Sequence, residues 1–260
     1  MNPESGRFAG LVVMAALLLL LVAGGSRAYR YGGLSALVGF GCYSESICFA
    51  RDNQAALPLD AVVYQSGGYD GQFFYYIAAE RYGGPAAVLD SEAFRRARIG
   101  YPLLAGPAYL LGSEALVLWM SLLLLLAHLG AILVLHRYLG RSPARRSSDT
   151  AAAVVPHGRL TIWLFALNPF SLYCFVLSVA DGLALSLAVV AAVWFRAADG
   201  RRSSDMQATG VAALAALALA LLTKETFLVA PVALGVSLLA GWGRGVSELR
   251  QSLVPAVLLI

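Results

Sequence analysis

The sequence predicts an all-α polytopic membrane protein with about six full transmembrane helices. Apolar residues make up 59% of its 260 residues and charged residues only 13%, which is far from the balance of a soluble domain. Its long apolar runs also lack the polar stripe that a core helix of a soluble protein presents to solvent. The clearest run, residues 115–135, is nearly uninterrupted and is long enough to cross a bilayer.

The first apolar segment, residues 8–25, has the length of either a transmembrane helix or the apolar core of a signal peptide. We expect a retained helix, because so hydrophobic a chain needs no cleaved signal to enter the membrane. The last run, residues 253–260, covers only about 12 Å of a roughly 30 Å hydrocarbon core, so we expect it to begin a truncated span of a longer protein. Residues 1–260 then form one multi-pass membrane domain, whose other full spans are predicted at residues 115–135, 160–178, 182–195, 209–222 and 227–242.

The distribution of basic residues predicts the orientation. Cytoplasmic loops carry an excess of Lys and Arg, whereas long extracytoplasmic loops are translocated largely regardless of charge. Of the 19 basic residues only Lys224 is a lysine, and the arginines in an Ala-, Gly- and Leu-rich background suggest a bacterial gene. With a cytoplasmic N-terminus in a bacterial plasma (inner) membrane, the inner segments hold more than half of the basic residues: residues 1–7, 136–159, 196–208 and 243–252.

Residues 26–113 form a long extracytoplasmic loop in this topology, and they hold ten of the twelve tyrosines. Those rings fit either an aromatic belt at the membrane interface or a surface that binds sugars. Within the loop, two glycines precede apolar and aromatic residues at positions 73, 74, 76, 77 and 78, which predicts an amphipathic helix lying in the interface. Asp70 then stands at or near the start of this helix, where it is either a helix cap or a catalytic carboxylate.

Three arginines, Arg95, Arg96 and Arg98, come just before a short apolar segment at residues 101–112. This segment is too short to cross a bilayer, so we expect an interfacial or re-entrant helix. Guanidinium groups in such a position either bind phosphates or extend toward ordinary lipid headgroups.

Two predicted hairpins turn at "SVADG" and "TKET", which carry Asp181 and the pair Lys224 and Glu225. The orientation puts both turns on the same outer side as Asp70. Because the hairpin arms are short, the charged turns form either the walls of an outward-facing cavity or ordinary solvated loops.

Several other kinds of chemistry are not expected. The three histidines do not have metal-ligand spacing, and no phosphate-binding loop, GxGxxG or GxSxG motif is present, so we predict neither a metal nor a cofactor. The arginines lie in short loops rather than on one face, which argues against nucleic acid as a partner. Cys42 and Cys48 share the outer loop, where a disulfide is permitted.

The segments "GYDGQFFYYIA" and "FRRARIGYPLLA", followed by "NPFSLYCFVLSVADG" and "LTKETFLVAP", make the chain resemble the GT-C superfamily of integral membrane glycosyltransferases. The resemblance covers most of residues 60–230 and is to mannosyltransferase-like members that use polyprenyl-phosphate sugars. It implies transfer with inversion of a sugar from such a donor to a glycan, lipid or protein acceptor outside the cytoplasm. It implies Asp70 as the base that takes the proton of the acceptor hydroxyl.

The same resemblance implies that cations stabilise the leaving lipid phosphate, and the candidates are Arg95, Arg98 and Lys224. It also implies that Gln72 and the neighbouring tyrosines, Tyr69, Tyr75 and Tyr76, orient sugar hydroxyls. Asp181 and Glu225, in the predicted cavity walls, are further candidates for substrate binding. Two other functions stay open. One is a polytopic transporter or lipid flippase, which commonly carries ionisable pairs near mid-membrane and shows inverted repeats. No repeat is found in this sequence. A noncatalytic membrane assembly protein leaves Asp70 beside Gln72 and the arginines without an explanation.

Overall fold

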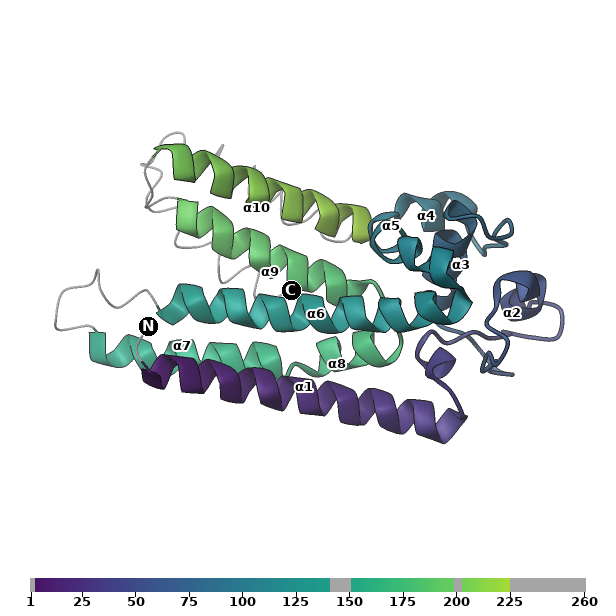
Figure 1. The fold of residues 1–260 in the computed structure, drawn as a ribbon, viewed down its shortest axis with the longest axis horizontal. Coiled ribbons are helices and arrows are strands. Elements are labelled where there is room, and N and C mark those ends of the chain that lie inside the picture. Colours follow the sequence, from purple (N-terminus) through teal and green to yellow (C-terminus); the bar gives the residue numbers. More distant parts are fainter. Residues whose placement is uncertain (1–2, 141–150, 199–202, 225–260) are drawn as a thin grey trace.

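The computed structural model describes residues 3–140, 151–198 and 203–224, and this part of the chain is helical, without a β-strand. Long helices run side by side as a bundle, and shorter ones gather at one end of it (Figure 1). The bundle consists of α1 (Pro3–Tyr31), α6 (Ser113–Gly140), α7 (Ala151–Ala166), α8 (Pro169–Val176), α9 (Asp181–Ala198) and α10 (Ser203–Thr223). The predicted all-α fold is therefore confirmed for these residues.

Residues 32–112 connect α1 to α6 and cover one end of the bundle; we call them the cap (Figure 1). All helices of the cap are short. They are η1 (Leu34–Leu37), α2 (Phe49–Asp52), η2 (Gln54–Ala56), α3 (Asp70–Arg81), α4 (Glu92–Ala97), α5 (Gly100–Ala105) and η3 (Gly106–Leu111). The short helix expected over residues 101–112 is thus divided between α5 and η3.

Among the described residues, three helical segments are long and apolar enough to cross a membrane: Glu4–Tyr31, Ser113–Leu139 and Gly158–Val176. They match the first three predicted spans. Two shorter apolar helices, Asp181–Phe195 and Thr209–Thr223, match the next two but fall below the length that a full span needs. The predicted spans at residues 227–242 and 253–260 lie outside the described residues.

The break between α7 and α8 has a local cause. Pro169 disfavours a helical conformation at Asn168, so α7 ends shortly before it. Asn168 then caps α8, because its side-chain oxygen accepts a hydrogen bond of 2.9 Å from the backbone N–H of Phe170. Proline at the first position of α8 loses nothing, since its missing N–H has no partner within the helix.

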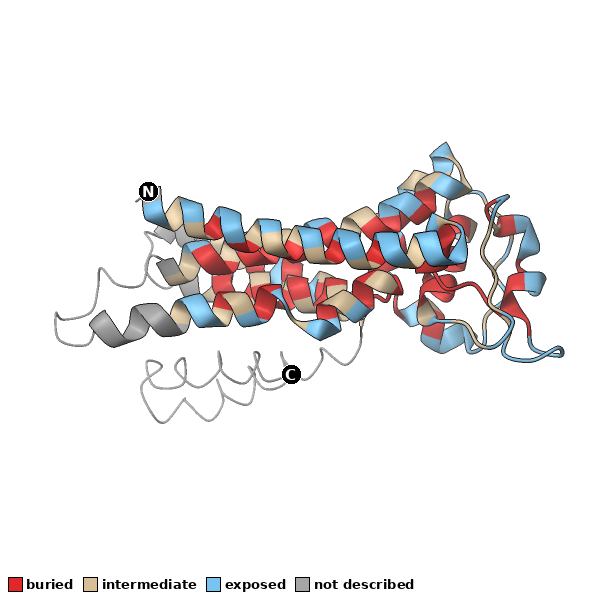
Figure 2. Ribbon diagram, turned by 90° about the horizontal axis from the view of Figure 1, so that it is seen from below, coloured by how far each residue is buried: buried red, intermediate tan, exposed pale blue. Residues whose placement is uncertain are grey.

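α6 lies at the centre of the bundle. In Figure 2 the buried residues follow the inside of the bundle, while exposed residues gather on the outward faces of the helices. Small residues permit close approach of neighbouring helices, because Gly24 faces the ring of Phe175 and Gly182 faces Cys174. The buried residues of α6 recur every three or four positions, mostly as adjacent pairs: Leu116, Val117, Met120, Ser121, Leu124, Leu125, His128, Ala131, Ile132, Leu135 and His136.

α3 is the central helix of the cap. Every residue from 71 to 79 is buried, so α3 has no exposed apolar face and the prediction that it is amphipathic is wrong. The reason is that rings from distant parts of the chain enclose α3: Phe40 stacks on Tyr76, and Tyr101 meets Phe74 edge to face. Tyr101 also ties the cap to the bundle, since its hydroxyl donates a 3.0 Å hydrogen bond to the carbonyl of Met120 in α6.

Two glycines let the cap approach the bundle closely. A Cβ atom added at Gly71 would lie 2.5 Å from the carbonyl oxygen of Val38 and 2.6 Å from that of Leu177. A Cβ atom at Gly100 would meet Thr223 at the end of α10. The start of α3 is therefore seated on the connection between α8 and α9, and the start of α5 is seated on the end of α10.

We expect Gly71→Ala to destabilise the protein, because two backbone carbonyls cannot move aside as a flexible side chain would. Overpacking of this kind costs about 1–3 kcal/mol, and each kcal/mol lowers Tm by roughly 2–4 °C in a chain of this size. Thermal unfolding in detergent measures the change. Gly10→Ala in α1 is the control, since nothing lies within 4 Å of its added methyl group. Equal Tm values for the two variants would contradict this packing.

Candidate functional site

Asp70 occupies the first turn of α3 at the junction of cap and bundle. The chain enters this helix through Gly67, whose φ of +82° suits glycine, and through an extended Tyr69 at the N-cap position. The Asp70 side chain retains 34% of its exposure, so it is accessible from outside. Among the described residues, its carboxylate oxygens have ion-pair partners in Arg95 and Arg98.

Arg95 is held in place by a carboxylate that the sequence analysis did not select. Its Nε and Nη2 atoms donate hydrogen bonds of 2.8 Å to Oδ1 and Oδ2 of Asp90. This paired contact directs the remaining atom, Nη1, toward Asp70, where it lies 3.0 Å from Oδ1. Nη1 is buried and makes no well-aligned hydrogen bond, so its attraction to Asp70 is mainly electrostatic.

Both arginines of the site are almost completely buried. The side chains of Arg95 and Arg98 are only 8% and 6% exposed, and Nη1 of Arg98 lies 3.6 Å from Oδ2 of Asp70. Aromatic rings support the two guanidinium groups. Cζ of Arg95 lies 4.2 Å from the ring centroid of Phe73, and Cζ of Arg98 lies 3.8 Å from that of Phe94. The accessible carboxylate is therefore backed by two deep positive charges.

The pKa values of the anchoring pair keep it charged at neutral pH. Hydrogen bonds from Arg95 hold the pKa of the Asp90 carboxyl below its usual value. Burial by itself lowers the pKa of Arg95, but the hydrogen bond to Asp90 and the attraction of Asp70 outweigh it, so the pKa is raised. Proton exchange within the physiological range does not release this anchor.

A second ion pair lies at the same junction. Nζ of Lys224, just after α10, is 3.2 Å from Oδ2 of Asp181 at the start of α9, and both side chains are mostly buried. Figure 1 shows this end of α10 beside α5. Ser178, with a φ of +48°, turns the chain from α8 into α9 beneath Gly71. The structure thus brings Asp181 and Lys224 to the cap, while the predicted site residue Glu225 lies outside the described part of the chain.

Three of the predicted sugar-binding side chains lie inside the cap instead of at its surface. Gln72 is fully buried, and its Oε1 accepts hydrogen bonds from the N–H of Gly41 (3.1 Å) and the hydroxyl of Tyr76 (3.4 Å). Tyr75 is buried as well, and its hydroxyl donates to the carbonyl of Ala56 at 2.8 Å. These groups use their hydrogen bonds to hold the cap together. Tyr69 differs, because its ring remains partly exposed next to Asp70.

Asp90 is a residue of this site that sequence reasoning missed. It stands five positions before Arg95, a spacing that does not place two side chains on one face of a helix. The pair forms because α4 begins only after Ser91, so the chain turns between them. Within residues 3–140, 151–198 and 203–224, no group of three His, Cys, Asp or Glu side chains is placed to hold a metal ion.

Comparison with known proteins gives no further guide: no protein-family model, no curated protein and no solved structure matches this chain.

We expect the Asp90–Arg95 pair to stabilise the cap in a pH-dependent manner. Because the pKa of Asp90 is lowered in the folded protein, its contribution is complete above the ordinary value of 3.8 and is lost as the pH falls through the lowered value. Asp90→Asn should therefore lower Tm at pH 7, and its difference from wild type should shrink below pH 3.8. Asp60→Asn removes an exposed carboxylate of the cap and is the control. A difference between wild type and Asp90→Asn that does not depend on pH would contradict the assignment.

Proposed function

We propose that the protein is a membrane glycosyltransferase that moves a sugar, with inversion, from a polyprenyl-phosphate donor to a hydroxyl of an extracytoplasmic acceptor. One observation carries the proposal: an accessible carboxylate, Asp70, stands in front of two deeply buried guanidinium groups, Arg95 and Arg98. Such a transfer needs one group that accepts a proton and fixed positive charge for a phosphate leaving group. The sequence resemblance to the GT-C superfamily assigns the same roles to the same residues.

In the proposed reaction, the acceptor hydroxyl lies within hydrogen-bond reach of Asp70. The carboxylate takes the hydroxyl proton while the oxygen forms a bond to the anomeric carbon of the donor sugar. The bond between that carbon and the phosphate oxygen breaks on the opposite face, so the configuration inverts. The lipid phosphate leaves with the electron pair of the broken bond, and its new negative charge is the charge that the cations stabilise.

Arg95 is well prepared for a phosphate. Asp90 fixes its guanidinium group through two nitrogens. Nη1 is therefore a rigid donor, and the side chain loses little conformational entropy when a phosphate binds. A bound phosphate would offer oxygens to this atom in place of Oδ1 of Asp70. The donor would thereby loosen the contact between Asp70 and Arg95, and the base would become free when the substrate is present. Lys224 is a third cation at the same junction.

The location of the charges supports an enzyme over a transporter. Transporters commonly hold their ionisable groups near the middle of the membrane, at the interface of repeats. In the described part of this protein, the ion pair of Asp70 and Arg95 lies within the cap, and that of Asp181 and Lys224 lies at the ends of α9 and α10. Three apolar helices of membrane-spanning length fit a protein that works beside a lipid-linked donor. We place the protein in a bacterial inner membrane, with its N-terminus in the cytoplasm and its site outside.

The test is transfer of radiolabelled sugar from a panel of polyprenyl-phosphate donors by the full-length protein in lipid nanodiscs. We expect Asp70→Asn to lower the transfer rate by about 100-fold or more, the usual share of a general base. Asp60→Asn should keep wild-type activity, because this carboxylate is exposed on another part of the cap.

Two results would overturn the proposal. One is an Asp70→Asn variant that transfers sugar at the wild-type rate. The other is a folded wild-type protein that transfers no sugar from any donor of the panel, which would favour the transporter or the assembly function instead.

A further inference from the structure

The segment of residues 39–43 runs alongside the segment that leads into Asp70. The N–H of Tyr64 donates to the carbonyl of Phe40 at 2.8 Å, the N–H of Cys42 to Tyr64 at 3.0 Å, and the N–H of Gly67 to Cys42 at 2.7 Å. Gly41 and Tyr64 form an isolated parallel bridge. These contacts bring Tyr43, the next residue, beside the glycines that precede Asp70.

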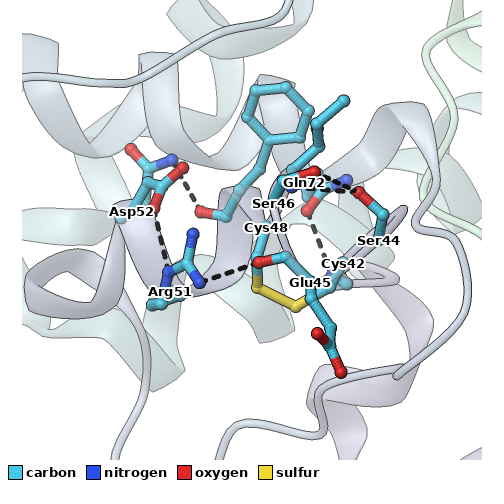
Figure 3. The surroundings of a disulfide bond; sticks show 12 residues. Cys42, Ser44, Glu45, Ser46, Cys48, Arg51, Asp52 and Gln72 are labelled. Atoms are coloured by element: carbon cyan, nitrogen blue, oxygen red, sulfur yellow. Dashed lines mark hydrogen bonds and ion pairs between the residues drawn. A yellow bond between two sulfur atoms is a disulfide. The ribbon is translucent and has the colours of Figure 1, made fainter.

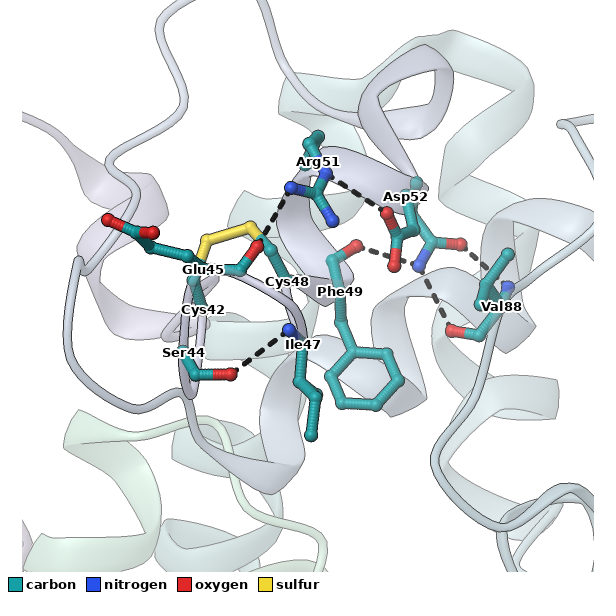
Figure 4. Close-up of polar contacts among 10 residues, drawn as sticks. Cys42, Ser44, Glu45, Ile47, Cys48, Phe49, Arg51, Asp52 and Val88 are labelled. Carbon is teal, nitrogen blue, oxygen red and sulfur yellow. Dashed lines mark hydrogen bonds and ion pairs between the residues drawn. A yellow bond between two sulfur atoms is a disulfide. The ribbon is translucent and has the colours of Figure 1, made fainter.

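A disulfide between Cys42 and Cys48 closes the turn that carries Tyr43 (Figure 3). Inside the turn, the N–H of Tyr43 donates to the carbonyl of Ile47 at 2.8 Å, and the N–H of Ile47 donates to Oγ of Ser44 at 3.1 Å. Figure 4 shows Arg51, which donates from outside to the carbonyl of Glu45 at 3.0 Å. The covalent bond and these hydrogen bonds fix the backbone from which Tyr43 projects.

The ring of Tyr43 ends a row of aromatic contacts that begins under Arg95. The guanidinium group of Arg95 lies over Phe73, Phe73 meets Phe49 edge to face with centroids 5.0 Å apart, and Phe49 meets Tyr43 at 5.9 Å. The hydroxyl of Tyr43 donates to the carbonyl of Gly68 at 3.4 Å. The residue is nevertheless 48% exposed, so about half of its surface is open to solvent.

The charges around Tyr43 are those of the candidate site. Burial raises the pKa of its phenol, and the negative charge of Asp70 raises it further, while Arg95 opposes this effect. The phenol therefore stays protonated and able to donate a hydrogen bond at neutral pH. A second partly exposed ring, Tyr69, packs against Gly39 directly before Asp70.

We propose that Tyr43 is an acceptor-binding residue of the Asp70 site and packs against a sugar ring, so that the acceptor is a glycan. A phenol ring offers an apolar face for the C–H groups of a sugar and a hydroxyl for its polar edge. Tyr43 is assigned to the acceptor because the arginines that suit the donor phosphate are almost completely buried, whereas Tyr43 is exposed at the surface of the cap. The acceptor role rests on the proposed function, with Asp70 as the base.

The disulfide has a defined task in this proposal. The turn between Cys42 and Cys48 contains no helix or strand, and hydrogen bonds of exposed turns open easily. The covalent bond keeps Tyr43 beside Gly68 and therefore beside Asp70. Loss of the disulfide should then weaken the same binding event that loss of the ring weakens.

Binding is tested without any transfer reaction. Saturation-transfer NMR with the full-length protein in lipid nanodiscs and methyl glycosides of mannose, glucose, galactose and arabinose should detect at least one bound sugar. Tyr43→Ala should weaken its affinity about fivefold to tenfold, which matches the strength of one aromatic contact. Tyr29→Ala, which removes a ring that is 90% exposed at the end of α1, is the matched control and should bind as wild type does.

A double-mutant cycle tests the link to the disulfide. The variant with Cys42→Ser and Cys48→Ser should show a similar loss of affinity, and adding Tyr43→Ala to it should cause little further change. Fully additive losses would mean that the disulfide does not act through Tyr43. Absence of binding by the wild-type protein, or a Tyr43→Ala variant that binds as tightly as wild type, would overturn the proposal.

These measurements separate the two proposals. If sugar binding depends on Tyr43 but Asp70→Asn transfers sugar at the wild-type rate, the sugar site stands and the assignment of Asp70 as the base fails. If transfer depends on Asp70 but sugar binding does not depend on Tyr43, the assignment of Asp70 as the base stands and the sugar site at Tyr43 fails.

Discussion

The contact of one guanidinium group with two carboxylates organises this structure. Arg95 is almost completely buried, and a charge at that depth is tolerated only when it is paired and hydrogen-bonded. Asp90 satisfies two of its nitrogens and Asp70 faces the third. These carboxylates therefore compensate for the loss of hydration of the buried guanidinium group, and the contact places a positive charge behind the accessible carboxylate of Asp70. Removing either partner would leave buried charge uncompensated, so the stability of the cap and the chemistry of the site depend on one arrangement.

Arg96, next to Arg95, stabilises the cap and does not contact Asp70 in the ion pairs described. α4 has only six residues, too few to be stable alone, and Arg96 fastens it to α3 through a 2.7 Å ion pair with Glu80. Hydrogen bonds with Glu80 and then Glu92 raise the pKa of Arg96, so this fastening stays charged. Arg96 pairs with Glu80 and Glu92, whereas Arg95 and Arg98 pair with Asp70. Arg96 thus fixes the short helix α4 to α3, while Arg95 and Arg98 provide positive charge at the Asp70 site.

Sequence reasoning located the elements better than their surroundings. Apolar length and composition suffice to predict helices such as α1 and α6, since these properties are local. The burial of α3 was not predictable in this way, because Phe40 and Tyr101 enclose it from distant positions. Asp90 and Tyr43 were not predicted for a similar reason. A turn brings Asp90 to Arg95, and a disulfide and a bridge between loops bring Tyr43 to Gly68. Periodicity describes a helix, but not what a loop presents to it.

The seating of the cap on the bundle has a consequence for how this protein can vary. Gly71 rests on the carbonyls of Val38 and Leu177, so backbone rather than side chains sets how deep the start of α3 sits. Bundle helices can then exchange one apolar residue for another of similar size without raising or lowering Asp70. Tolerance to substitution should be high along the long helices and low at Gly71 and Gly100. Relatives that share little of the bundle sequence could still present the same carboxylate at the same height.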